Sequence, residues 1–177
     1  GSATKVADML TLSDKCYRAE LVLGMTTDTQ DADGEVLTEC EVTCSEDEIR
    51  QVIMSFVGEI EQIPPMYSAI KQNGKKLYEL ARKGIEVERK SRKVTINSID
   101  ILKINGERVT IDVSCSKGTY IRTLCEDIGM KLHVGAYMNT LRRTKIGPFT
   151  IEESHTLKEI ETLKNNGELE KIIIPVD

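Results

Sequence analysis

The sequence contains no long apolar run, no C-x-x-C pair and no clustered histidines. Without about 20 consecutive apolar residues no helix can span a membrane, and no secretory signal is visible, so we expect no membrane association. The five cysteines are odd in number and three lie in apolar patterns, which predicts free thiols in a reducing cytoplasm. His133 and His155 are isolated, so no metal site is expected.

The 177 residues suffice for one sizeable domain with a hydrophobic core, and 30% of them are charged. A net charge of −5 argues against a general nucleic-acid binder. The charge is unevenly placed, however. Lys71–Lys93 holds nine Lys or Arg against three Glu, a local charge of +6, so the remainder of the chain carries −11. Tyr67 and Tyr78 are interleaved, and this pattern favours an exposed cationic insertion that grips a phosphate backbone over an ordinary solvated helix face.

Hydrophobic periodicity predicts an α+β fold with a mixed, mostly antiparallel sheet and flanking helices. Ser45-x-x-Glu48 and Thr156-x-x-Glu159 are capping boxes that predict helix starts, and Asn105-Gly106 predicts a hairpin turn. A short helix is expected over roughly Lys75–Lys83. The expected strands are Tyr17–Leu23, Val94–Ile104, Glu107–Cys115, Tyr137–Ile146 and one further strand near Phe149 and Ile151.

Gly24–Gly34 is rich in Thr and Asp and is interpreted as a long turn rather than a packed element. Its three aspartates, Asp28, Asp31 and Asp33, resemble a calcium loop. That pattern needs glycine at its sixth position, which counted from Asp28 is Asp33, so the match fails. We therefore expect these side chains to bond the local backbone.

Cys115–Gly129 is the segment around which the chain is organised: the end of a strand, a Lys-Gly turn and then a helix. Gly118 allows a backbone conformation closed to other residues, and Thr119 is the expected helix cap. Tyr120 and Arg122 flank the apolar stripe of the first turn, where a cation and a polar aromatic could hold a planar or anionic ligand. Spacing alone favours instead an Arg122–Glu126 pair, with Tyr120 as packing.

Six motifs follow one another along the chain, and together they resemble bacterial tRNA pseudouridine synthase B, the TruB family. They are K-x-Y-R-A at Lys15–Ala19, G-M-T-T-D-T-Q-D-A-D-G, I-P-P-M-Y-S-A-I-K at Ile63–Lys71, G-K-K-L-Y-E-L-A-R-K-G, C-S-K-G-T-Y-I-R-T-L and L-R-R at Leu141–Arg143. The resemblance implies isomerisation of uridine 55 in the T loop of tRNA, with the base flipped into a pocket and no cofactor or metal. The implied partner is the T arm of tRNA.

One family feature is missing. The family carries its nucleophilic aspartate in a G-x-L-D-P-x-A-x-G segment before A-T-K, and this sequence contains no Leu-Asp-Pro. We therefore expect residues 1–177 to be a partial, inactive catalytic domain. It would lack the N-terminal strand that should complete the sheet and the family's C-terminal RNA-binding module. Residues 62–93 are expected to form an RNA-binding, thumb-like insertion. Exposed sheet edge would favour self-association. The alternative is a non-catalytic RNA-binding fragment that grips the T arm. Whether Gly1-Ser2 is native stays open.

The resemblance also assigns site residues. Tyr17 corresponds to the active-site tyrosine, which stacks on the flipped base and serves proton transfer at C5; core packing is its alternative. Arg122 corresponds to the arginine that pairs with the catalytic aspartate, and here it would be unpaired or paired with Glu126 or solvent. Asp31 is assigned a structural role. The implied substrate-binding residues are Tyr120 and Leu141 in the pocket wall, Lys71, Lys75 and Lys76 in the thumb, and Lys5 near the site. For Lys5 a structural role is an equal alternative.

Overall fold

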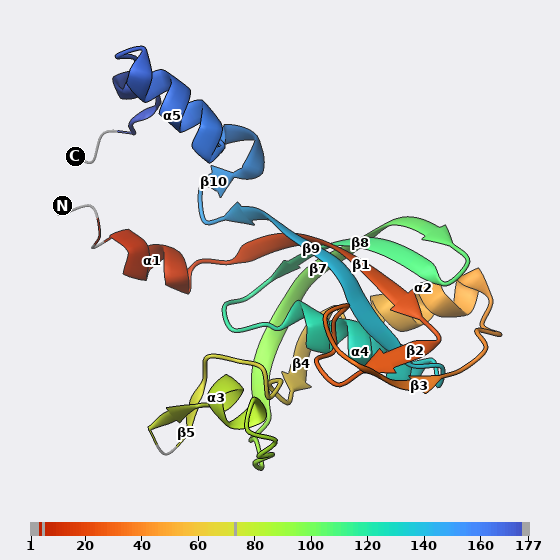
Figure 1. Cartoon of the computed structure of the whole chain (residues 1–177). Coiled ribbons are helices and arrows are strands. Elements are labelled where there is room, and N and C mark those ends of the chain that lie inside the picture. Colours follow the sequence, from red (N-terminus) through yellow and green to blue (C-terminus); the bar gives the residue numbers. More distant parts are fainter. Residues whose placement is uncertain (1–3, 5, 73, 175–177) are drawn as a thin grey trace.

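Alternating apolar and polar residues in Lys15–Leu23 and Arg108–Cys115 form the two central strands, β1 and β8. In this computed structural model, which describes residue 4 and residues 6–72 and 74–174, the two strands pair antiparallel within a six-stranded sheet (Figure 1). The strand order is β10-β9-β1-β8-β7-β4. The other strands are Phe149–Thr150 (β10), Ala136–Ile146 (β9), Arg92–Asn105 (β7) and Gly58–Gln62 (β4). The pairings described within this sheet are antiparallel, so the predicted α+β class is confirmed.

Two amphipathic helices, α2 (Glu46–Met54) and α4 (Ile121–Lys131), cover one face of the sheet (Figure 1). The predicted capping box of α2 is confirmed, since Ser45 Oγ accepts from the Glu48 N–H and the Glu48 carboxylate accepts from the Ser45 N–H at 2.8 Å. Both helices place their apolar stripes on the sheet, and this contact is the hydrophobic core. Its fully buried members include Leu21, Ile53, Ile111, Leu124 and Ile128.

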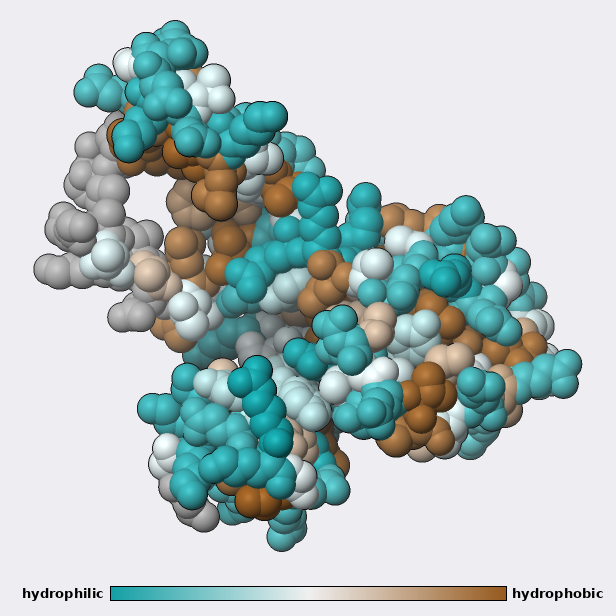
Figure 2. Space-filling view, in the orientation of Figure 1, coloured by the Kyte–Doolittle hydropathy of each residue, from teal (hydrophilic) through white to brown (hydrophobic). Residues whose placement is uncertain are grey.

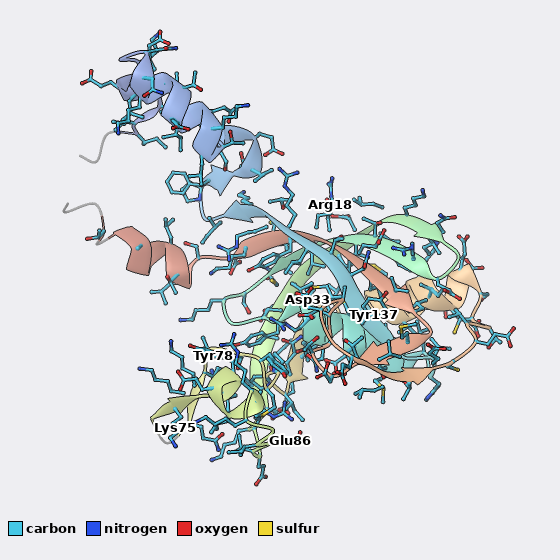
Figure 3. All side chains as sticks on the ribbon, viewed as in Figure 1. Arg18, Asp33, Lys75, Tyr78, Glu86 and Tyr137 are labelled. Carbon is cyan, nitrogen blue, oxygen red and sulfur yellow. The ribbon has the colours of Figure 1, made fainter. Side chains whose placement is uncertain are left out.

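The opposite face of the sheet carries charged side chains that pair across the strands. Arg18 bonds Asp112 at 2.7 Å, and Arg108 and Asn139 both donate to Glu20 at 2.7 Å. Figure 3 shows Arg18 on this face, away from α4. The two faces of β1 therefore differ as its alternation predicts.

The basic insertion (residues 62–93) forms a small lobe at the end of β4 and β7 (Figure 1). It contains β5 (Lys71–Gln72), β6 (Lys75–Lys76) and α3 (Leu77–Ala81). The predicted helix over Lys75–Lys83 is thus shorter than expected, because Lys75 and Lys76 pair with β5 as a strand. Gly84 follows with φ +67°, the left-handed conformation that ends helices at glycine.

Smaller elements complete the chain. β2 (Met25–Thr27) and β3 (Val36–Glu39) form a two-stranded sheet, and α1 (Val6–Leu12) precedes β1. The last part contains η2 (Ile151–Glu153), α5 (Leu157–Asn165) and η3 (Leu169–Ile172). α1 and α5 extend beyond the end of the main sheet, and Figure 2 shows apolar residues along the side of α5 turned toward α1. In the described part of the chain, no helix has both the length and the apolar character needed to cross a bilayer.

Candidate functional site

The strand–turn–helix segment predicted from Cys115 to Gly129 is confirmed, with Gly118 at φ +81° in the turn. Its predicted cap is wrong. Thr119 Oγ1 donates to Ser116 O at 2.9 Å, and the N-cap position of α4 is Tyr120, whose own side chain makes no cap bond. The buried amide of Gln62 bonds the Tyr120 backbone in its place. The start of α4 is therefore held by a strand distant in sequence.

Arg122, in the first turn of α4, is neither unpaired nor paired with Glu126. Its Nη1 lies 2.8 Å from Asp31 Oδ2, and the two side chains are 27% and 17% exposed. Desolvation strengthens such a pair relative to one in water. The spacing argument failed because the side chain reaches a loop 91 residues away instead of the next turn of its own helix.

The loop that carries Asp31 is docked on the sheet and on α4, which corrects its interpretation as an unpacked turn. Gln30 adopts a left-handed conformation, φ +65°, and its side chain bonds Thr123 and Glu126 of α4. The Gln30 carbonyl accepts from the Met138 N–H of β9 at 3.0 Å. The predicted bonding of aspartate side chains to the local backbone is confirmed for two of the three, because Asp28 Oδ1 accepts from the Glu35 N–H at 2.8 Å and Asp31 Oδ1 accepts from the Asp33 N–H at 3.2 Å.

Two adjacent carboxyl groups on α4 have raised pKa values, and one of them, Glu126, bonds Gln30 of this loop. Burial, with the neighbouring Asp127 charge, raises the pKa of Glu126, and the Gln30 bond partly offsets that rise. Burial alone raises the pKa of Asp127 to about 6. Burial also raises the pKa of the Cys125 thiol to about 12, so this cysteine stays protonated and is not a nucleophile at neutral pH.

A cleft of about 620 Å³ lies between this loop and the basic insertion. Arg122 and the loop acids line one side, and Tyr67, Tyr78 and Arg82 of the insertion line the other. Figure 2 shows the hollow beside the hydrophilic insertion, and Figure 3 shows Tyr78 on the side of the insertion that faces the loop of Asp33. The Arg82 guanidinium lies 5.3 Å from the Tyr78 ring centroid, a cation–π distance.

Tyr17 and Leu141 lie on the α4 face of the sheet. In the β1–β9 ladder Tyr17 is opposite Arg143 and Ala19 is opposite Leu141. Residues opposite one another point to the same face, and Ala19 is fully buried in the core on that face. Tyr17 is half-buried against the core, with the Arg143 guanidinium 5.6 Å from its ring, whereas Leu141 is 44% exposed.

The Arg122–Asp31 pair lies on this same face. Asp31 is the bridge partner of Met138 in β9, three residues before Leu141. A β-bulge lies between them, so Met138 is opposite Leu21 and Leu141 is opposite Ala19. At about 3.3 Å per residue, Leu141 is roughly 7 Å further along the strand. The lining of the 620 Å³ cleft, however, includes neither Tyr17, Tyr120 nor Leu141 among the described residues. The structure thus gives Arg122, Leu141 and Tyr17 a common face but leaves their joint binding of one base as a prediction.

The lysines assigned to the insertion are spread over it. Lys71 lines a second cavity, about 350 Å³, at the base of the insertion. Lys75 is exposed near the outer end (Figure 3), while Lys76 Nζ lies 3.3 Å from the Tyr78 hydroxyl near the cleft. Lys5 lies outside the described residues.

Sequence reasoning missed Gln30 and Gln62 and gave Asp31 no part in holding Arg122. The only signal for Gln30 was its place inside the T-D-T-Q-D-A-D-G motif, and Gln62 offered none beyond its position before Ile63-Pro64-Pro65.

These features together define a class of protein. The six-stranded antiparallel sheet with α2 and α4 on one face is the pseudouridine synthase fold, as its similarity to solved structures shows. Two solved structures share it: a Cbf5-Nop10-Gar1 complex (TM-score 0.73, 32% identity, 98% of this chain and 45% of that one) and an H/ACA RNP bound to a substrate RNA containing 2′-deoxyuridine (TM-score 0.68, 29% identity, 98% and 43%).

The chain belongs to the TruB family. A family model described as TruB family pseudouridylate synthase (N terminal domain) matches residues 1–121, and one described as tRNA pseudouridylate synthase B C-terminal domain matches residues 122–177. Curated relatives named tRNA pseudouridine synthase B are 54% identical in Alkaliphilus oremlandii and 53% identical in Clostridium perfringens (strain SM101), each over 100% of this chain. The chain spans 58% and 60% of the length of these two relatives.

Proposed function

We propose that residues 1–177 form part of the catalytic domain of a tRNA pseudouridine synthase that isomerises uridine 55 in the T loop of tRNA. The observation that supports this most strongly is the 54% identity to a relative of that name along the whole chain. The geometry is consistent with it, because a basic insertion, a cleft and a partly buried arginine adjoin one face of the sheet. The five free cysteines suit a reducing compartment, so we place the protein in the cytoplasm.

The proposed reaction exchanges one bond of the base for another. The glycosidic bond between C1′ and N1 breaks, the uracil turns, and a bond forms between C1′ and C5. C5 then loses its proton, and N1 takes up one proton and ends as N–H. Atoms and electrons balance without an oxidant or a cofactor. The nucleophile is the aspartate of the Leu-Asp-Pro segment, which this sequence does not contain, so we expect no turnover by the 177-residue chain alone.

Arg122 is proposed to hold that carboxylate ionised and correctly oriented. Its bonds to Asp31 Oδ2 and to Thr29 O both use Nη1, and a guanidinium offers five donors, so other N–H groups remain to bind a second carboxylate. Asp31 then acts as a fixed support that keeps Arg122 in place before the nucleophile and the base arrive.

Tyr17 is proposed to stack on the everted uracil and to serve proton transfer at C5, with Tyr120 and Leu141 as apolar walls. Everting a base costs a few kcal/mol of lost stacking. Stacking on one aromatic side chain can recover on the order of 1–3 kcal/mol of this cost. Leu141 is 44% exposed without RNA, which suits a side chain that becomes buried when a base arrives.

The basic insertion is proposed to grip the backbone of the T arm, with Lys71, Lys75 and Lys76 among its contacts. The charge contrast supports this role, since the insertion is strongly cationic and the remainder of the chain is acidic. A second candidate function, RNA binding without catalysis, rests on this same surface together with the missing aspartate segment.

Release of tritium from tRNA labelled at uridine C5 tests the proposal, because only formation of the C1′–C5 bond expels that hydrogen. The full-length gene product should release one tritium per tRNA, and a transcript with cytidine in place of uridine 55 should lose this signal. Tight binding without release would favour the non-catalytic function. Release by the 177-residue chain alone would contradict the expected need for the Leu-Asp-Pro aspartate.

A further inference from the structure

Gln62, the last residue of β4, is 1% exposed, and its side chain bonds a segment remote in sequence. Its Nε2 donates to Tyr120 O at 3.2 Å, and its Oε1 accepts from the Tyr120 N–H at 3.0 Å. One side-chain amide thus reproduces the pair of bonds that a neighbouring strand would make. A buried amide satisfied at both ends is held in one orientation, and it holds its partner equally.

The partner is the N-cap residue of α4. Tyr120 makes no side-chain cap bond, and the first turn of α4 contains no acidic residue to complement the helix dipole. Gln62 instead satisfies the Tyr120 N–H, the donor that the Glu or Gln of a capping box would bond. Arg122 follows two residues later, so the same contact sets where its side chain starts.

Gln62 also marks the base of the basic insertion. It forms the last pair of the β4–β7 ladder, opposite Arg92, and Ile63-Pro64-Pro65 follows at once. On the returning side of the insertion, the Arg89 guanidinium donates to Pro64 O at 3.2 Å. Both ends of the insertion thus meet within two residues of Gln62.

We infer that Gln62 is a positioning residue that couples the base of the insertion to the first turn of α4, and so to Arg122. This inference rests on the proposed function. The physical path is short. Arg89 closes the base of the insertion on Pro64, two residues after Gln62. Gln62 in turn fixes Tyr120, which immediately precedes the first turn of α4 that carries Arg122. RNA held by the insertion is then presented to an arginine whose position is already fixed.

The test is a pair of substitutions in the full-length gene product. Gln62→Met keeps the length of the side chain and removes both bonds. We expect kcat for tRNA to fall about 10- to 100-fold, as for a catalytic group displaced by a fraction of an ångström, with KM within about 2-fold. Gln51→Met, an exposed glutamine of α2, is the matched control and should leave both constants unchanged.

Combining Gln62→Met with Arg122→Lys separates positioning from general loss of stability. If Gln62 acts through Arg122, Gln62→Met should lower kcat less than 3-fold in the Arg122→Lys background, because coupled residues are non-additive. The inference would be overturned if Gln62→Met lowered kcat by the same factor in both backgrounds. It would also be overturned if the substitution lowered kcat and RNA affinity equally.

Two further outcomes are decisive. If Gln62→Met does not fold, Gln62→Asn, whose shorter amide cannot span both Tyr120 groups, should show the same split between kcat and KM. If neither variant folds, Gln62 is a residue of the folding core and the inference is wrong. A wild-type protein that binds tRNA but forms no pseudouridine would instead contradict the proposed function.

Discussion

The guanidinium of Arg122 is three-quarters buried, and a carboxylate from a distant loop fixes it at the edge of a cleft. A lysine would keep the charge but offer a compact ammonium group instead of a planar fork of donors. At this site the difference between the two cations concerns geometry more than charge. Substitution of Arg122 by lysine can therefore distinguish the contribution of donor orientation to catalysis from the contribution of positive charge alone.

Arg122→Lys in the full-length gene product should lower kcat/KM for pseudouridine formation on the order of 10²- to 10³-fold, while the Kd for T-arm RNA changes by less than about 3-fold. Single-turnover kinetics and filter binding measure the two quantities. Arg50→Lys on the exposed surface of α2 is the control and should change neither. Equal losses in rate and affinity would mean that Arg122 only positions RNA.

Asp127 gives a prediction for stability against pH. Burial raises its pKa from 3.8 to about 6, so the ionised carboxylate is less favourable in the folded state. The unfavourable effect appears as pH rises from about 4 through 6 and is complete above that range. The full shift corresponds to roughly 3 kcal/mol, which partial solvent exposure reduces to about 1 kcal/mol.

Asp127→Asn should therefore raise the free energy of unfolding by about 1 kcal/mol at pH 7.5 and by nearly nothing at pH 4. Urea unfolding at the two pH values measures this difference. Glu161→Gln, an exposed carboxyl on α5, is the control and should have little effect at either pH. A destabilised Asp127→Asn protein at pH 7.5 would mean that the carboxylate has a stabilising partner.

Single residues show where sequence reasoning stops. The reach of Arg122 to Asp31 spans 91 residues, and the contact of Gln62 with Tyr120 spans 58. Helical spacing described only the near neighbours of Arg122, so it favoured Glu126. Such long-range partners depend on how the sheet brings distant loops together. Local sequence patterns do not indicate that arrangement.

At the scale of the elements, Gly129 allows α4 to pack closely against the start of β9. A Cβ added there would lie 2.1 Å from the Ala136 backbone N, a distance that real Cβ atoms do not show. The helix and the start of β9 approach this closely only because the side chain is missing. Because the contact is with backbone, a neighbouring side chain cannot simply rotate away.

Gly129→Ala should thus destabilise the fold by about 3 kcal/mol or more, although alanine is the better helix former. Chemical unfolding of the 177-residue chain measures the loss. Met130→Ala, at an exposed neighbour on the same helix, is the control and should change stability by less than about 0.5 kcal/mol. A stabilised Gly129→Ala protein would mean that the helix can move away from β9 at little cost.

Elements with local signals were predictable. The capping boxes before α2 and α5 and the Asn105-Gly106 turn between β7 and β8 are all present. The N-cap of α4 was misplaced, because Thr119 had the right chemistry but its hydroxyl bonds Ser116 O instead. The Gly24–Gly34 loop was misjudged for the complementary reason: its Thr and Asp residues are typical of turns, but Gln30 docks it on α4.

At the scale of the whole molecule, charge separates the basic insertion from the acidic remainder. Not every lysine of the insertion is free to meet RNA, since Lys93 Nζ bonds Glu59 at 2.7 Å and Lys76 adjoins Tyr78. The exposed lysines are the better candidates for phosphate contacts. They are Lys71, Lys75, Lys83 and Lys90.

Replacing these four lysines by glutamine should reduce the magnitude of the slope of log K against log salt for T-arm RNA by about 3 to 3.5, because each phosphate contact contributes about 0.7–0.9. Binding titrations between low and physiological salt measure the slope. The matched control replaces four exposed lysines outside the insertion, Lys103, Lys145, Lys158 and Lys164, and should leave the slope almost unchanged. Identical slopes for both quadruple variants would exclude the insertion as the gripping surface.

The overall fold class was predictable because the strand and helix periods are strong, whereas the assignment of Tyr17 and Leu141 came from family resemblance. From the residues alone, Tyr17 is indistinguishable from core packing, and in the structure it does pack against the core. Tyr17 lies on the same face as Leu141 and the Asp31–Arg122 pair because of the strand register. Hydrophobic periodicity does not specify that register.

Photocrosslinking from the target base examines this face directly. A T-arm RNA with 5-bromouridine at position 55 is irradiated in complex with the 177-residue chain, and the linked peptide is identified by mass spectrometry. We expect the link at Tyr17 or Tyr120, and its loss when the bromouridine is moved into the stem. A link confined to the opposite face of the sheet, at Arg18 or Arg142, would contradict the proposed binding of an everted uracil beside Arg122.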